Sequence, residues 1–69
     1  MNFGGKLREL REKAGLSQEK FAKILGKDNT TISRWESSER CPGIKTLVAI
    51  ATYFNVTSDY LLGINQEGV

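Results

Sequence analysis

Histidine is absent from the sequence, and Cys41 is the single cysteine. One thiol can form no disulfide within the chain, and a metal site built from imidazole and thiolate ligands is nearly excluded. Without histidine, a nucleophile such as Ser17 or Cys41 also has no obvious general base. We therefore expect no enzymatic activity, no cofactor and no bound metal.

Long apolar runs are missing as well. No stretch approaches the roughly 18 apolar residues that are needed to span a membrane. The opening segment, MNFGGKLREL, lacks the apolar stretch of a signal peptide. A chain of 69 residues can form only one small domain with a modest core. These absences predict a soluble protein of the reducing cytoplasm that has no membrane partner.

Charge is distributed unevenly, although the net charge is only +2. Residues 1–42 carry nine basic and six acidic side chains, whereas residues 43–69 carry one basic and two acidic side chains. A basic surface on the first two-thirds of the chain is compatible with contact to phosphates. The asymmetry alone gives weak support for nucleic-acid binding.

Apolar residues recur at helical spacing, and β alternation is not seen anywhere in the chain. Phe3, Leu7, Leu10 and Ala14 follow one another at intervals of four, three and four residues. This spacing predicts a first helix with one apolar side, which Gly15 ends.

Capping residues mark the next two helices. Ser17 has the position of an N-cap, so we expect a second helix over residues 18–25 that ends at Gly26. Asp28 caps a third helix, which extends to about Ser37, and its carboxylate lies at the positive end of the helix dipole.

Pro42 separates the third helix from the rest of the chain, because it has no N–H to donate to a continuing helix. A fourth helix is expected over residues 44–54, with Asn55 in the left-handed conformation at its end. Thr57 then has the position of a cap for a last short helix, which ends at Gly63.

The predicted fold class is all-α, a compact bundle of five helices. Residues 1–64 form its single domain, and residues 65–69 are expected to fray because they carry no capping or periodic signal. The second and third helices are joined only by GKD. Two short helices with a tight glycine-containing turn make a helix-turn-helix unit, whose second helix can enter the DNA major groove. Many helical hairpins bind nothing, so this shape needs support from its side chains.

The third helix is predicted to have two different sides. Ile32 and Trp35 lie three residues apart, so both face the core, and packing is favoured over base stacking for Trp35. The other side carries short polar groups and one guanidinium: Asn29, Thr30, Ser33 and Arg34. Arginine can pair bidentately with guanine, and asparagine with adenine. Gln18 opens the preceding helix, where backbone amides and a side-chain amide can hold a phosphate.

A family resemblance rests on three segments of the chain. LSQEKFAKILGKDNTTISRWE, LVAIATYFNV and DYLLG together resemble the DNA-binding domain of lambda-type phage repressors and Cro proteins. These belong to the xenobiotic-response-element class of helix-turn-helix regulators. The resemblance covers roughly residues 7–63. It implies a lambda-repressor-like fold, with the helix-turn-helix at the second and third helices, that binds double-stranded DNA in the major groove.

The resemblance also implies roles for individual residues. Base contacts are implied for Asn29, Thr30, Ser33 and Arg34. Gln18 matches a position that clamps a phosphate and also buttresses the third helix. Arg11 and Glu36 match a partly buried ion pair that ties the first helix to the third. The other expected phosphate contacts are Ser17, Lys27, Ser37 and Arg40. Two of them depart from the family pattern: Lys27 replaces the usual small apolar residue, and Arg40 takes over the contact of a usual lysine that is Glu39 here. Ser38 stands where relatives often have glycine, which predicts strain if its backbone is left-handed.

The predicted function is sequence-specific regulation of transcription, most simply repression by operator occupancy. One module of this size buries little surface, so we expect a homodimer on a palindromic operator with half-sites about 34 Å apart. The dimer surface is expected around residues 60–69, and no small-molecule ligand is evident. The alternative is a protein-interaction helix-turn-helix module, such as an antitoxin-like partner that also binds its own promoter.

Overall fold

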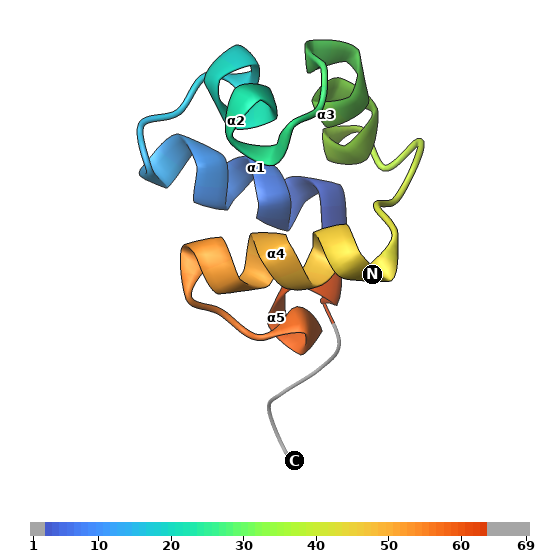
Figure 1. The fold of residues 1–69 in the computed structure, drawn as a ribbon. Helices are drawn as coiled ribbons and strands as arrows, with labels where there is room; N and C mark the ends of the chain where they lie inside the picture. The colour runs from blue at the N-terminus through green and yellow to red at the C-terminus, as the bar shows by residue number, and fades with distance from the viewer. Residues whose placement is uncertain (1–2, 64–69) are drawn as a thin grey trace.

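The computed structural model describes residues 3–63, which form an all-α fold (Figure 1). Within this range the helices are α1 Phe3–Lys13, α2 Gln18–Leu25, α3 Asn29–Glu36, α4 Ile44–Phe54 and α5 Ser58–Leu62. The predicted bundle of five helices is confirmed, whereas the expected frayed tail at residues 65–69 lies outside the described residues. Between residues 3 and 63, no helix has the length and apolarity of a membrane span.

Side-chain caps begin three of the helices. Each is the predicted cap, and its side-chain oxygen accepts a hydrogen bond from the backbone N–H three residues later. The pairs are Ser17 with Lys20 at 3.1 Å, Asp28 with Thr31 at 2.8 Å and Thr57 with Tyr60 at 3.0 Å. These bonds satisfy N–H groups that have no partner within the helix, and so they fix where α2, α3 and α5 begin.

Left-handed residues end three of the helices. Gly26, Asn55 and Gly63 follow α2, α4 and α5 with φ angles of 70°, 59° and 74°. The first helix ends earlier than its apolar stripe suggested. Ala14 is exposed in the turn before Gly15, so its assignment to the inward side was wrong. The chain turns away there because Gly15 also takes up a left-handed conformation, with φ of 73°.

One core joins all the described helices. Each helix contributes one apolar side chain with no exposed surface: Leu7, Phe21, Ile32, Ile50 and Leu61. Burying a side chain of this size contributes about 1.5–3 kcal/mol. The rings of Phe21 and Phe54 lie 5.5 Å apart and link α2 to α4. The core therefore holds α2 in place, and α2 in turn supports α3.

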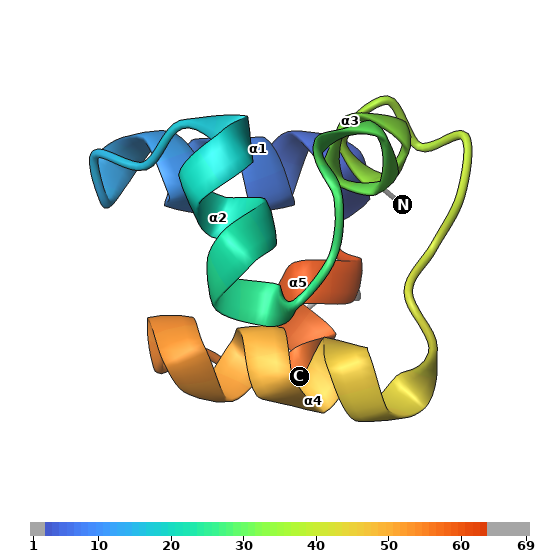
Figure 2. The same ribbon diagram turned by 45° about the horizontal axis from the view of Figure 1, so that its top comes forward.

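The helices α2 and α3 lie together above α1 in Figure 1, whereas α4 and α5 lie below it. α3 packs against both α1 and α2. Figure 2 shows the loop that leaves α3 and runs along the edge of the molecule to the start of α4. α3 therefore lies at the surface, and no other described helix covers its outer side.

Candidate nucleic-acid interface

α3 turns its apolar side chains into the core and its polar side chains outward. Ile32 is fully buried, and Trp35 is only 5% exposed. The residues expected to contact bases are all exposed: Asn29, Thr30, Ser33 and Arg34. Within the described part of the chain, the side chains of these residues make no hydrogen bond. Their polar groups are therefore available to an external partner.

Glu36, the last residue of α3, is held by side chains from two other helices. Its carboxylate accepts hydrogen bonds from Arg11 Nε at 2.5 Å and from Arg11 Nη2 at 3.1 Å. It accepts another from Gln18 Nε2 at 3.0 Å. Because Arg11 lies on α1 and Gln18 on α2, one carboxylate ties α3 to both helices. The side chains of Arg11 and Glu36 are 10% and 5% exposed, so water screens this ion pair weakly.

Arg11 has a further partner in the turn after α1. Its Nη1 donates a hydrogen bond of 2.7 Å to the carbonyl oxygen of Leu16. Hydrogen bonding to Glu36 raises the pKa of Arg11 above its already high ordinary value, although burial alone would lower it. The buried guanidinium therefore stays charged, and it fixes the orientation of α3.

Three of the residues expected to contact phosphates already hydrogen-bond within the protein: Ser17, Gln18 and Ser37. The Ser17 oxygen caps α2, and the Gln18 amide nitrogen is directed toward Glu36. Ser37 Oγ donates to the carbonyl oxygen of Arg34 at 3.0 Å. The Ser17 hydroxyl and the Gln18 amide each keep a donor for a further partner. Their structural roles and a phosphate contact are therefore chemically compatible.

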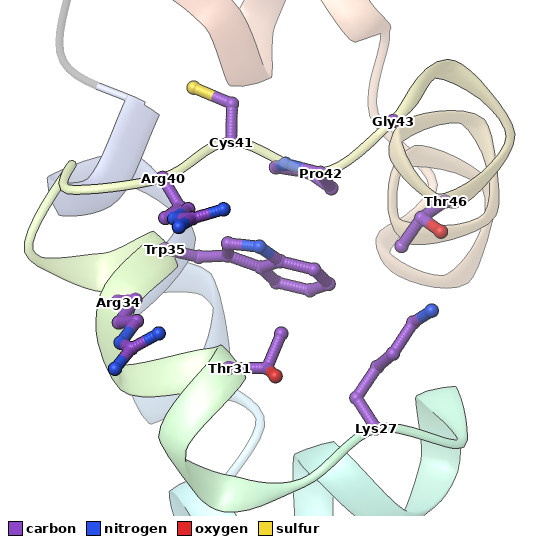
Figure 3. Close-up of a pocket in the computed structure, with 9 residues that line it drawn as sticks. All are labelled: Lys27, Thr31, Arg34, Trp35, Arg40, Cys41, Pro42, Gly43 and Thr46. Carbon is purple, nitrogen blue, oxygen red and sulfur yellow. The ribbon is translucent and has the colours of Figure 1, made fainter.

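Lys27 and Arg40, which were also expected to contact phosphates, both line a surface hollow (Figure 3). The hollow lies between α3 and the start of α4 and has a volume of about 300 Å³. Its lining residues are Lys27, Thr31, Arg34, Trp35, Arg40, Cys41, Pro42, Gly43 and Thr46. Trp35, Thr31 and Thr46 were not singled out from the sequence as site residues. The hollow forms only when the loop after α3 folds back, so no local sequence signal marks it.

Asp28 places a negative charge at the beginning of α3. Its exposed carboxylate accepts the backbone N–H of Thr31 at 2.8 Å. Thr31 lowers the pKa of Asp28, first through its side chain and then through its backbone N–H, and the charge of Arg34 adds to this effect. The cap is therefore ionised at neutral pH, and it favours the positive end of the helix dipole.

α1 begins in close contact with the end of α3. A Cβ atom on Gly4 would overlap the carbonyl oxygen of Glu36 and would lie 2.7 Å from Ser38 Oγ. Ser38 has a φ of 65°, so the residue that replaces the usual glycine is in the left-handed conformation. A residue with a Cβ atom is strained there by about 1–2 kcal/mol. The end of α3 is thus positioned by a glycine on one side and a strained serine on the other.

A family model for helix-turn-helix domains matches residues 7–61. The chain belongs to the lambda-repressor-like class of this helix-turn-helix family. The resemblance inferred from the sequence is thereby confirmed, with α2 and α3 as the helix-turn-helix pair. Curated relatives in this family are named as transcriptional regulators, in line with the expectation of no enzymatic activity. No group of side chains between residues 3 and 63 could hold a metal ion.

Two curated helix-turn-helix relatives match most of the chain. The transcriptional regulator ImmR of Bacillus subtilis is 40% identical over 63 residues, which cover 91% of this chain and 50% of ImmR. The transcriptional activator BcrR of Enterococcus faecalis is 42% identical over 62 residues, which cover 90% of this chain and 30% of BcrR. The chain thus spans half of ImmR and less than a third of BcrR.

A solved helix-turn-helix structure has the same fold. The P22 c2 repressor, crystallised in complex with the synthetic operator 9T, superimposes with a TM-score of 0.81 and 33% sequence identity. The match covers 88% of this chain and 92% of that one. Because it covers nearly all of both chains, the helix-turn-helix pair stands on the same scaffold in the two proteins.

Proposed function

We propose that this helix-turn-helix chain is a sequence-specific transcriptional regulator that binds operator DNA through the outward side of α3. The buried anchor at Glu36 and the exposed polar side of the same helix support this function. The relatives support it too. ImmR and BcrR are named as transcriptional regulators, and the P22 c2 repressor is solved with an operator.

The orientation of α3 carries the proposal. Ile32 and Trp35 hold one side of the helix in the core, and Glu36 fixes its end to α1 and α2. Arg34 therefore projects from a rigid support. A bidentate arginine–guanine pair contributes about 1–3 kcal/mol of discrimination against a wrong base. Asn29, Thr30 and Ser33 add shorter contacts along the same side.

We infer that the regulator acts as a repressor, by occupying an operator so that a competitor is excluded. A single module contacts few base pairs, so a homodimer on a palindromic operator would supply the missing discrimination. The dimer surface was expected at residues 60–69, of which residues 64–69 lie outside the described ones. Tyr60 is half-buried, with Lys6 Nζ 4.5 Å from the centre of its ring.

Binding to a random duplex across a salt series tests contact with DNA. The logarithm of the affinity should fall steeply with the logarithm of the salt concentration, by about 0.9 for each phosphate neutralised. Arg40→Ala, which removes an expected phosphate contact, should weaken binding to the random duplex. Lys13→Gln removes one positive charge at the last residue of α1, where Lys13 forms an exposed pair with Glu9, and should have little effect. Absence of duplex affinity at low salt would refute the proposal and would favour a protein-interaction helix-turn-helix module that does not bind DNA.

A further inference from the structure

The ring of Trp35 is buried, whereas its indole N–H donor has no partner among the described residues and lies at the surface. Trp35 is 95% buried, and no residue in the described part of the chain accepts a hydrogen bond from its nitrogen. Every buried side-chain nitrogen or oxygen in this part has a hydrogen-bond partner, so the unpaired indole nitrogen must be accessible to solvent. The surface that Trp35 lines is the hollow, and Figure 3 shows its nitrogen on the ring edge toward Pro42.

Basic side chains from three separate segments line the same hollow. Lys27 comes from the turn before α3, Arg34 from α3 itself and Arg40 from the loop after it. Thr31 and Thr46 add hydroxyl groups, and the lining described above contains no carboxylate. In Figure 3, Arg40 lies beside the indole, and Lys27 extends toward Thr46 across the opening. Positive charge, hydroxyls and a neutral N–H donor together fit a tetrahedral oxyanion.

We propose that this hollow holds one phosphate group, to which Trp35 Nε1 donates a hydrogen bond while Lys27 and Arg40 neutralise the charge. This proposal rests on the proposed function, because the phosphate is taken to belong to the backbone of DNA bound beside α3. Trp35 then acts in two ways, as a core residue through its ring and as a ligand through its nitrogen. A free phosphate ion has the same chemistry and is the other possible source.

Trp35→Phe tests the hydrogen bond, because it removes the N–H and keeps an aromatic ring in the core. Binding of a fluorescently labelled random duplex at low salt should weaken about tenfold, as expected for the loss of one hydrogen bond to a charged group. Helical circular dichroism and the melting temperature establish that the variant is folded. Lys13→Gln is the matched control, because Lys13 is exposed and does not line the hollow, and it should bind like the wild type.

A second variant separates a shared phosphate from independent contacts. Arg40 is exposed, so Arg40→Ala should fold normally and should also weaken duplex binding about tenfold. If both side chains hold one phosphate, the double variant of Arg40→Ala and Trp35→Phe should lose less duplex affinity than the product of the two single fold-losses. A fold-loss in the double variant equal to that full product would show two independent contacts and would overturn the shared site. If Trp35→Phe does not fold, a normal affinity of Arg40→Ala would overturn it as well.

A titration with inorganic phosphate distinguishes the two sources. Trp35 is the only tryptophan, so its emission reports on the hollow directly. A saturable change with millimolar phosphate, absent with sodium chloride at equal ionic strength, would assign the site to a free ion if Trp35→Phe binds duplex normally, and to the DNA backbone if Trp35→Phe binds duplex more weakly. No such change, together with weaker duplex binding by Trp35→Phe, would assign it to the DNA backbone. If the wild type binds duplex, but Trp35→Phe binds equally well and phosphate has no effect, the hollow is not a phosphate site. A wild type that binds neither duplex nor phosphate would refute both proposals.

Discussion

Glu36→Gln should be the most damaging conservative substitution in this fold. The change keeps the size of the side chain but removes its charge, whereas Arg11 keeps its own. Arg11 is 10% exposed at its side chain and makes its two bonds to Glu36 from that buried position. The substitution therefore leaves a buried guanidinium without a counter-charge. It also turns one carboxylate oxygen into an NH₂ group that faces donors.

The expected loss is large relative to the whole stability of the domain. Breaking one side of a buried ion pair costs about 3–5 kcal/mol. A chain of this length has a total free energy of unfolding of roughly 3–10 kcal/mol. One substitution should thus remove roughly a third of the stability or more. Each 1 kcal/mol lowers the melting temperature of a domain of this size by about 4–8 °C, so a fall of at least about 12 °C is expected.

Urea unfolding followed by circular dichroism and by Trp35 emission measures this loss. Glu39→Gln is the matched control, because Glu39 is exposed and makes no ion pair among the described residues. A double variant with Arg11→Met and Glu36→Leu should recover most of the stability, since it removes both charges together. A loss of less than 1 kcal/mol in Glu36→Gln would refute the inference that this pair anchors α3.

Three further substitutions test local features. Ser38→Gly should stabilise the fold by about 1 kcal/mol in urea unfolding, because glycine tolerates the left-handed conformation; a loss of stability would contradict the strain. Gly4→Ala should destabilise it by about 1–3 kcal/mol, because the new Cβ atom meets the backbone of Glu36, and an unchanged midpoint would show that α1 can shift freely. The pKa of Asp28 is lower in the folded state, so its stabilising effect is complete above the ordinary value of 3.8 and is lost as the pH falls through the lower folded value. The urea midpoints of the wild type and Asp28→Ala should therefore converge below pH 3.8, and a constant difference would refute this linkage.

The helices could be predicted from the sequence because their ends carry local chemical signals. Ser17, Asp28 and Thr57 each cap the helix that follows, using a side chain and a backbone N–H only three residues apart. Spacing also placed Ile32 and Trp35 on the inner side of α3. Ala14 fitted the spacing of α1 but lies beyond its end. The spacing of apolar residues does not predict where a helix ends, and here the helix stops before the left-handed turn at Gly15.

The hollow and the contact at Gly4 could not be predicted in the same way. Thr46 reaches the hollow from α4, and Arg40 from the loop, so they meet Trp35 only in the folded chain. Gly4 lies against the carbonyl oxygen of Glu36, a neighbour far away in the sequence. The partly buried ion pair was expected through the family resemblance, whereas its additional bonds depend on tertiary geometry. Local rules therefore predict the elements, and packing determines how the site is assembled.

Selection of bound sequences from a randomised duplex pool tests most directly whether the outer side of α3 reads DNA. The wild type should enrich a palindromic motif, and Arg34→Ala should relax the preference at one base position per half-site with a loss of about 1–3 kcal/mol. Enrichment of no motif by the wild type, or the same motif and affinity from Arg34→Ala, would contradict the assignment of α3 as the recognition helix.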